Sequence, residues 1–398
     1  MTKNSPLLFI EISSFEFIFI AINQLENGES KLLGKNSCPI QGIKDRKIFD
    51  LDLVKNIFEK NIYSLEKKIN FTFRETIIII DNFNCSLINF SGFKKLNGSQ
   101  LVKENITYII NSLKSKINEI EKNKTILHIF NSKYFLDKAS MQNLPIGLFG
   151  NFYSHELSFF LIDNNDFKNI NYILKQCNLK IKKIISQNFL EGTQIINERK
   201  NLESFFKIEI NKNISQMIFF ENSSFKYKQI FNFGSDLIIN DISKIIGLSY
   251  DNVKNFLTLE NFSTNNSDEE YLDKKFFINQ NFRKVKKNLV HEIAKARINE
   301  FAEVLLFKNI NTQSFLKDNK KIFLRIVDDL NTNCFKKDYK YFFSNKNSLE
   351  FNFLPNNNLE IFYSNASNLV QYGWKKEAIP VVQENKSIIA RIFDLISK

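Results

Sequence analysis

Runs of apolar residues separated by short polar breaks open the chain. Residues 7–12 and 15–22 are apolar enough to form strands, and the Ser-Ser pair between them predicts a tight turn. After an Asn-Gly pair, which is typical of a hairpin turn, a third strand is predicted at residues 31–36. The pattern therefore predicts an antiparallel meander that begins a sheet.

Helical periodicity and buried strands follow this meander. Apolar positions recur with helical spacing in residues 50–68, and residues 76–80 are an all-apolar run typical of a strand covered on both faces. Residues 81–163 are then predicted to form an insertion with elements of its own. Its predicted strands lie at 85–90, 125–130 and 156–162, and its predicted helix at 103–120. The first pattern resumes with a helix at 166–177.

A second meander begins about 200 residues after the first, with predicted strands at 205–210, 215–221 and 225–231. Two such openings indicate a duplicated architecture. Residues 282–308 are predicted to be one long helix, and further strands are expected toward residue 362. The inward face of that helix is predicted to carry Val285, Leu289, Ile293, Ala296, Phe301 and Val304.

The end of the chain has the pattern of a short amphipathic helix at residues 387–398. Its apolar face carries Ile388, Ile389, Ile392, Phe393, Leu395 and Ile396, and its polar side carries Lys386, Arg391, Asp394 and Lys398. Residues 371–386 include Pro380 and are expected to be a linker. The pattern leaves two alternatives open: the helix lies on a lipid headgroup surface, or it packs back on the parent domain.

Composition limits the partners of the chain. Its 398 residues include 42 Phe but only 11 Gly and 1 Trp, and they are rich in Asn, Lys and Ile. All of these abundant residues have A/T-rich codons, so the bias reflects base composition, and the formal charge of +12 is discounted accordingly. Lysines are spread through nearly every segment, which does not favour nucleic-acid binding and fits an anionic membrane better.

The cysteines and the apolar runs indicate the compartment. Four cysteines lie far apart with no metal-ligand spacing, which is typical of a reducing environment. No apolar run is long and uncharged enough to be a signal peptide or a transmembrane helix, so the protein is expected in the cytoplasm. His128, on an apolar strand, is interpreted as an interior imidazole, and no catalytic or metal-binding arrangement is predicted.

Several short motifs, in order, resemble the FtsA family of bacterial cell-division proteins within the actin-like superfamily. They are Ser37-Cys38-Pro39-Ile40-Gln41-Gly42, Leu127-His128-Ile129-Phe130 with Tyr134 and Asp137, Pro145-Ile146-Gly147-Leu148-Phe149-Gly150, Gln176-Cys177-Asn178-Leu179, Gly234 with Asp241-Ile242, and Arg297 with Glu300. The resemblance is strongest from Ser37 to Leu179 and weak after Ile310.

The resemblance implies an α/β, actin-like (ribonuclease H-like, duplicated) two-lobed fold, with an inserted α/β subdomain in the first half and a C-terminal amphipathic helix. The first lobe would comprise residues 1–80 and 164–200, with the insertion at 81–163. The second lobe would comprise 201–235 and 311–370, with a smaller subdomain at 236–310. The linker and the membrane-targeting helix, at 371–386 and 387–398, would complete the chain.

The resemblance also places a nucleotide site, but its phosphate loops are degenerate. The family's Asp-x-Gly-Gly-Gly-Thr-x-Asp corresponds to residues 209–216, where all three glycines and the second carboxylate are missing, and no Gly-Gly occurs near residues 324–329. The candidate cofactor residues are Glu11, Ser13, Ser14, Glu209, Lys212, Asn213, Gln216 and Gly234. We expect no hydrolysis and no bound cofactor. Two alternatives stay open for the cleft: weak ATP binding through Lys212 and the two serines, or a cleft filled by side chains.

For function, the resemblance implies an adaptor, not an enzyme, at the division site on the cytoplasmic face of the inner membrane. It would bind the C-terminal tail of FtsZ, self-associate into filaments and recruit later division proteins. The candidate tail-binding residues are Arg283, Lys286, Lys287 and Arg297, for which a solvated basic face is the alternative. The candidate membrane-binding residues are Ile388, Ile389, Arg391, Ile392, Phe393, Leu395, Ile396 and Lys398. An actin-like ATPase and a pilus-type actin-like adaptor are the competing interpretations.

Overall fold

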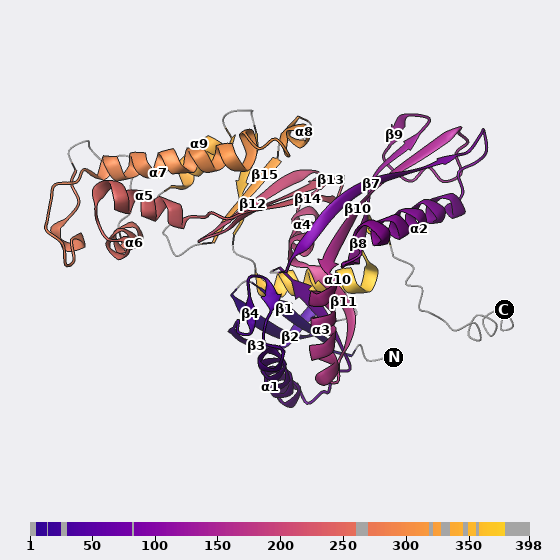
Figure 1. Cartoon of the computed structure of the whole chain (residues 1–398), viewed down its shortest axis with the longest axis horizontal. Helices are drawn as coiled ribbons and strands as arrows, with labels where there is room; N and C mark the ends of the chain where they lie inside the picture. The colour runs from indigo at the N-terminus through magenta and orange to yellow at the C-terminus, as the bar shows by residue number, and fades with distance from the viewer. Residues whose placement is uncertain are drawn as a thin grey trace.

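Two five-stranded sheets with the same strand plan form the body of the protein (Figure 1). The first sheet has the order β3-β2-β1-β6-β11 and the second the order β14-β13-β12-β15-β16. In each, three antiparallel strands are continued by two parallel ones. The matching order confirms the predicted duplication. The computed structural model describes residues 5–13, 15–24, 30–81, 83–259, 270–317, 321–327, 335–344, 349–355 and 358–378.

The strands of both sheets follow the apolar runs of the sequence. The first sheet contains β1 (Leu7–Ile12), β2 (Glu16–Gln24), β3 (Ser30–Pro39), β6 (Glu75–Ile80) and β11 (Lys180–Ser186), and β4 (Ile43–Lys44) and β5 (Lys47–Ile48) form a small hairpin. The second sheet contains β12 (Phe205–Asn211), β13 (Ser215–Glu221), β14 (Ser224–Phe231), β15 (Lys321–Val327) and β16 (Glu350–Phe353). The central strands β1 and β6 are buried at almost every position, because side chains cover both faces of the sheet.

The helices of the first lobe are α1 (Leu51–Ile69), α3 (Asn164–Gln176) and α4 (Gln187–Glu198). Asp50 begins α1 by accepting a hydrogen bond from the backbone N–H of Leu53 at 2.9 Å, and Asn70 ends it in the left-handed conformation with φ of 54°. The buried positions of α1 are spaced at helical period and face the sheet, as the sequence predicted: Val54, Phe58, Ile62 and Leu65.

The insertion is a four-stranded sheet, of order β7-β10-β8-β9, with one helix packed on it. Its elements are β7 (Cys85–Lys95), α2 (Lys103–Ile120), β8 (Lys124–Leu136), β9 (Ala139–Met141) and β10 (Phe152–Asp163). Gly92 lets the helix approach closely, because a Cβ there would lie 2.5 Å from Ile109. The insertion extends away from the first lobe beside the second sheet, on the right of Figure 1.

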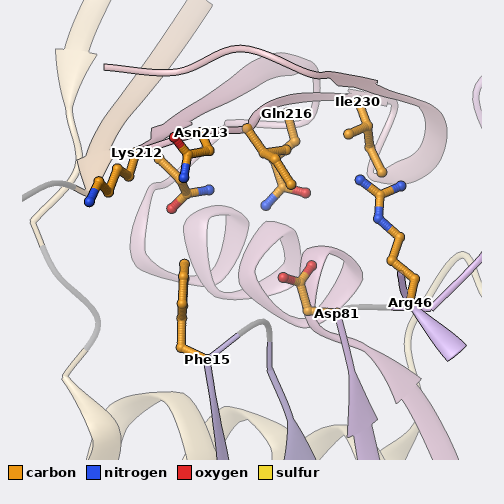
Figure 2. Close-up of a pocket in the computed structure, with 9 residues that line it drawn as sticks. Phe15, Arg46, Asp81, Lys212, Asn213, Gln216 and Ile230 are labelled. Carbon is orange, nitrogen blue, oxygen red and sulfur yellow. The ribbon is translucent and has the colours of Figure 1, made fainter. Parts of the chain in front are cut away.

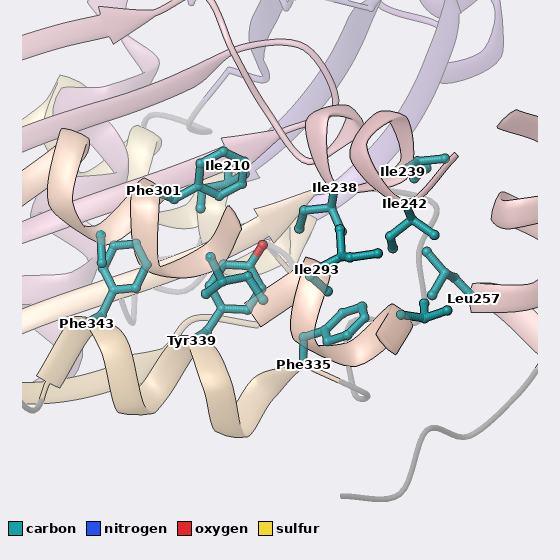
Figure 3. Close-up of a cluster of buried hydrophobic side chains, with 14 of the residues drawn as sticks. Ile210, Ile238, Ile239, Ile242, Leu257, Ile293, Phe301, Phe335, Tyr339 and Phe343 are labelled. Carbon is teal, nitrogen blue, oxygen red and sulfur yellow. The ribbon is translucent and has the colours of Figure 1, made fainter. Parts of the chain in front are cut away.

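The second lobe carries the helices on the left of Figure 1. They are α5 (Asp236–Ile246), α6 (Tyr250–Leu259), a 3-10 turn η1 (Lys274–Phe276), α7 (Lys287–Ala302), a π-helical turn η2 (Glu303–Phe307), α8 (Gln313–Leu316) and α9 (Lys336–Ser344). Figure 3 shows their shared core, to which Ile242 of α5, Ile293 of α7 and Tyr339 of α9 all contribute.

The long helix predicted at residues 282–308 begins five residues later than predicted and is helical as far as Phe307. It begins at Lys287, because Lys286 has an extended backbone and pairs with Tyr271 in an antiparallel bridge, and after Ala302 it continues as the π-helical turn η2. Leu289 and Val304 are 45% and 38% exposed, and Ala296 is also exposed, so these three residues do not face inward as predicted. The buried residues of α7 include Ile293 and Phe301, as predicted, together with Val290, Ala294, Ile298 and Ala302.

A helix, α10 (Leu359–Tyr372), occupies the region where the sequence predicted a strand near residue 362. It lies at the centre of Figure 1, where it packs on α4. The ring of Phe220, from the second sheet, lies so close to α4 that a Cβ at Gly192 would be 2.1 Å from it. Side chains of α4, α10 and both sheets therefore form one apolar cluster, which joins the two lobes.

The segment after α10 also differs from the expected linker. Trp374 donates its indole N–H to the carbonyl of Ser223 at 2.7 Å, and the backbone of Lys376 and Ala378 is hydrogen-bonded to β8. The first residues of the predicted linker, as far as Ala378, are thus packed on the body. The rest of it lies outside the described residues.

Candidate functional site

A pocket of about 230 Å³ lies between the two lobes (Figure 2). The first lobe contributes Phe15, Arg46 and Asp81, and the second contributes Asn211, Lys212, Asn213, Ile214, Gln216 and Ile230. In Figure 2 the amide of Gln216 points toward Asp81, whereas the side chain of Lys212 points away from it. Pockets that enclose a small-molecule ligand or cofactor usually measure roughly 300–1,000 Å³, so this volume is small for a whole nucleotide.

Two carboxylates and two cations, which we call the buried ion cluster, lie beside this pocket: Glu191, Lys207, Glu209 and Arg325. The parallel register of β12 and β15 places Glu209 directly beside Arg325. Arg325 Nη1 lies 2.8 Å from Glu191 Oε1 and 3.3 Å from Glu209 Oε2. Lys207 Nζ contacts the Glu191 carboxylate and lies 3.0 Å from Glu209 Oε2.

The electrostatics of the cluster keep Glu191, Lys207 and Arg325 charged. Burial by itself would raise the pKa of Glu191, but Lys207 and Arg325 outweigh burial and lower that pKa to about 2. Burial would lower the pKa of Lys207, but Glu191 and Glu209 hold it above its usual value. The charges of the four side chains therefore cancel within the protein, where an uncompensated ion would be costly.

A chain of amides connects the cluster to the pocket. Gln216 donates to Glu209 Oε1 at 3.2 Å, and Asn188 donates to Gln216 Oε1 at 3.1 Å and to Asp81 Oδ1 at 3.3 Å. Burial raises the pKa of Asp81, which stands at the pocket immediately after β6. Gln216, a neutral amide, thus stands where the family pattern has its second carboxylate.

Glu11 is buried near the end of β1 and is not among the residues that line the pocket. The hydroxyl of Tyr363, from α10, donates to Glu11 Oε2. Burial raises the pKa of Glu11 to about 7, and the hydrogen bond from Tyr363 opposes that rise. A helix that the sequence did not predict therefore supplies the contact of this candidate phosphate-site residue.

Ser13 and Gly234 have local structural partners. The hydroxyl of Ser13 donates to the carbonyl of Glu16 at 2.8 Å and accepts from the backbone N–H of Glu16 at 3.0 Å, which closes the β1–β2 turn. A Cβ at Gly234 would lie 2.0 Å from the carbonyl oxygen of Asn211, so glycine there allows the chain to pass close to the β12–β13 turn.

The structure therefore brings together only part of the predicted cofactor set. Lys212, Asn213 and Gln216 line the pocket, and Glu209 belongs to the buried ion cluster. Glu11, Ser13 and Gly234 do not line the pocket, and Ser14 is outside the described residues. No group of three or more His, Cys, Asp or Glu in the described part of the chain is arranged to hold a metal ion.

Five residues of this region carried no predicted role: Asp81, Asn188, Glu191, Lys207 and Arg325. A signal existed for some of them. Lys207 and Arg325 are cations within apolar strands, and a charge in such a strand is rarely buried without a partner. Nothing local in the sequence identifies the partner, because Glu191 and Arg325 are 134 residues apart.

No family model matches the chain. The sequence is 22% identical to cell division protein FtsA of Buchnera aphidicola subsp. Schizaphis graminum over 389 residues, which cover 94% of the chain and 92% of that relative. It is 17% identical to cell division protein FtsA of Escherichia coli (strain K12) over 246 residues, or 62% of the chain and 58% of the relative.

A solved structure titled PilM-PilN type IV pilus biogenesis complex superposes with a TM-score of 0.54 at 7% identity, over 93% of this chain and 99% of that one. This chain is a divergent FtsA-like protein with an actin-like fold. The duplicated sheets and the inserted subdomain of the FtsA-like protein are the parts that the sequence resemblance predicted.

The predicted tail-binding residues of the FtsA-like protein do not form one group. Arg297 lies 2.5 Å from Asp241 and 2.6 Å from Glu300, and Lys287 lies 3.5 Å from Glu270. Arg283 and Lys286 are exposed on the extended segment before α7. Phe282, 45% exposed, and Leu289 accompany them, so the accessible part of this surface is both basic and apolar.

The predicted membrane-binding residues of the FtsA-like protein, from Ile388 to Lys398, lie outside the described residues. None of the described helices is both long and apolar enough to cross a bilayer.

Proposed function

We propose that this protein is a cell-division adaptor that ties FtsZ filaments to the cytoplasmic face of the membrane at the division site. The observation that carries the proposal is the alignment with FtsA over 94% of the chain and 92% of the relative. In this proposal the inserted subdomain serves self-association and contacts with later division proteins. The protein acts by holding partners together, not by chemistry.

The basic and apolar surface before α7 is the proposed docking site for the FtsZ tail. Arg283 and Lys286 are exposed cations, and Phe282 and Leu289 are exposed apolar side chains within the same stretch. An acidic tail with apolar residues would pair with the cations and cover the apolar groups. Arg297 is excluded from this role, because Asp241 and Glu300 already hold it.

Residues 387–398 are the proposed membrane contact. Six large apolar side chains, each contributing about 1.5–3 kcal/mol when fully buried, provide attraction that partial insertion and ordering reduce. One copy would bind a vesicle reversibly. Copies linked through a filament would bind more strongly, because each further anchor engages at a high effective concentration.

One co-flotation experiment tests both contacts. Labelled FtsZ tail peptide is mixed with vesicles of anionic phospholipid, and it is expected to float with the vesicles only when the full chain is present. A chain that ends at Lys386 should leave both protein and peptide at the bottom of the gradient. Ile392→Asp should weaken flotation of the protein by roughly 10- to 100-fold, because it removes one buried apolar side chain, whereas Asp394→Asn is the matched control on the polar side.

Substitutions on the body separate the tail contact from the lipid contact. Lys286→Glu is expected to leave the protein on the vesicles and to weaken peptide recovery by roughly 3- to 10-fold. Lys308→Glu, an exposed lysine beyond the other end of α7, is the control. If the full chain stays off anionic vesicles at every concentration, or carries no peptide to them, the proposed adaptor function is wrong.

We further propose that the protein does not hydrolyse ATP. Lys207 and Arg325 hold Glu209, the counterpart of the family's first carboxylate in the second phosphate loop, and three glycines of that loop are replaced by larger residues. Phosphate release from Mg-ATP is therefore expected to remain at the background rate, and Glu209→Ala should not change it. Turnover above background that disappears in Glu209→Ala would show an actin-like ATPase instead.

A pilus-type adaptor is the second candidate, because the PilM-PilN complex shares the fold over 93% of the chain. Such a protein would bind a peptide from a membrane partner and would not need residues 387–398 for its location. Co-flotation that persists in the chain ending at Lys386, without binding of the FtsZ tail, would favour this alternative.

A further inference from the structure

After α10 the chain turns at Gly373 and places Trp374–Ala378 along the edge of β8. We call these five residues the latch strand. The backbone N–H of Asn131 donates to the carbonyl of Lys376 at 2.7 Å, and the N–H of Ala378 donates to the carbonyl of Ile129 at 2.8 Å. Glu377 stands opposite Phe130 as in an antiparallel bridge. The latch strand is thus joined to the sheet of the inserted subdomain by a single antiparallel bridge, at Glu377.

The side chain of Glu377 makes the strongest contacts of the latch strand. His128 Nδ1, fully buried on β8, lies 2.6 Å from Glu377 Oε1, and Lys183 of β11 lies 2.9 Å from Oε2. Burial would raise the pKa of Glu377, but His128 and Lys183 outweigh burial and lower the pKa to about 2. One carboxylate therefore connects the inserted subdomain to the first lobe.

Trp374 of the latch strand also contacts the second lobe. Its indole N–H bonds the carbonyl of Ser223, in the turn between β13 and β14, and its ring packs edge-on against Phe189 of α4 with ring centroids 6.4 Å apart. The latch strand therefore contacts the insertion, the first lobe and the second lobe within five residues.

We propose that the latch strand is detachable, and that its docking in cis on the β8 edge fixes where the C-terminal tail leaves the body. Three features favour release without unfolding of the body. The strand is short, two backbone hydrogen bonds hold it to β8, and Gly373 provides a hinge. At Gly373 φ is +74°, and an added Cβ would meet no atom within 4 Å. A terminal segment with so few backbone hydrogen bonds opens at lower free energy than the core once the side-chain contacts of Glu377 and Trp374 are broken.

Release would change the reach of the tail. The latch strand ends at Ala378, so its detachment adds its own five residues to the chain between the body and residues 387–398. At about 3.3–3.6 Å per extended residue, this lengthens the connection by at most roughly 18 Å. This consequence for membrane attachment rests on the proposed function, whereas the detachable docking does not.

The single tryptophan of the chain, Trp374, is a direct probe of the latch strand. In the full-length protein, Glu377→Gln is expected to shift Trp374 emission to the red and to raise its quenching by acrylamide. Amide exchange at Asn131 and Ala378 should accelerate by roughly 10- to 100-fold, because hydrogen bonds to a charged group are lost. Amides of β10 should keep their rates. Glu203→Gln, which removes only an exposed partner of Lys375, is the matched control.

A peptide tests release in the unaltered protein. The peptide Gly-Phe-Lys-Lys-Glu-Ala copies the latch strand with Phe in place of Trp, so Trp374 of the protein remains the only indole. Millimolar peptide is expected to shift Trp374 emission as Glu377→Gln does, and the same peptide with Lys in place of Glu should not. The proposal fails if the peptide leaves Trp374 emission unchanged, or if the amide hydrogens of Asn131 and Ala378 exchange only together with those of β10. No lipid or FtsZ is present, so this outcome is independent of the adaptor test.

Discussion

Glu191→Leu is expected to lower the free energy of unfolding by about 3–5 kcal/mol, because it leaves a buried cation without its counter-ion. The side chains of Glu191 and Lys207 are 2% and 1% exposed, so water cannot replace the lost carboxylate. Glu209 would then face both Lys207 and Arg325 alone. Urea denaturation followed by far-ultraviolet circular dichroism measures the loss.

A control and a second substitution make this prediction specific to charge. Glu198→Leu alters an exposed glutamate on the same helix, and it should change the free energy of unfolding by no more than about 1 kcal/mol. Adding Lys207→Met to Glu191→Leu should recover part of the loss, because Glu209 and Arg325 then remain as a matched pair. If Glu191→Leu costs no more than Glu198→Leu, the cluster is not the stabilising element that its geometry indicates.

Acidification is expected to destabilise the inserted subdomain through His155. This side chain is fully buried on β10 between the rings of Tyr134 and Tyr153, and neither ring nitrogen has a hydrogen-bond partner among the described residues. Burial lowers its pKa from 6.5 to about 4, and Lys376 of the latch strand adds to the shift. Between these two values the unfolded chain binds a proton that the folded chain does not.

The sign and size of the effect follow from this difference. Above pH 6.5 the titration of His155 does not change the free energy of unfolding. As the pH falls from 6.5 toward 4, that free energy decreases by at most about 3 kcal/mol, because the unfolded chain binds a proton at His155 and the folded chain does not. His155→Phe should remove that part of the pH dependence and should stabilise the protein at neutral pH, because the unpaired ring nitrogens disappear. Urea titrations at several pH values between 4 and 7 measure both effects.

His291 is the control of opposite sign. Its hydrogen bond to Asp338, at 2.9 Å, raises its pKa, so its contribution to stability is present at low pH and is lost as pH rises through the raised value. His291→Gln should therefore leave the acid-induced loss from His155 in place. If His155→Phe unfolds in acid as readily as the unaltered protein, another group is responsible.

The buried ion cluster gives physical support to the proposed loss of the phosphate loops. Glu209 has two cationic partners inside the protein, so it is no longer a free ligand for a hydrated metal ion. Tyr363 likewise holds Glu11, and Gln216 is neutral. The lobes share one apolar cluster through α4 and α10, so side chains now join the halves of the fold in the region where the resemblance places a nucleotide.

Local pattern was sufficient for many elements of the fold. The bounds predicted for β1, α2 and β13 agree with the structure, because apolar periodicity within a few residues determines which side of a strand or helix is buried. The start of α7 was not predictable in this way. Its first five predicted residues are not helical, since Lys286 pairs with Tyr271, and that pairing depends on the folded subdomain.

The sequence by itself determined the two meanders, the insertion and the proposed degeneracy of the phosphate loops, because each depends on the pattern of residues within a short stretch of the chain. Only the tertiary structure decided that Glu191 meets Arg325, that Tyr363 holds Glu11 and that the latch strand docks on β8. These partners are separated by 134 residues or more along the chain. A buried charge requires a counter-ion but does not specify which one, and packing of the lobes makes that choice.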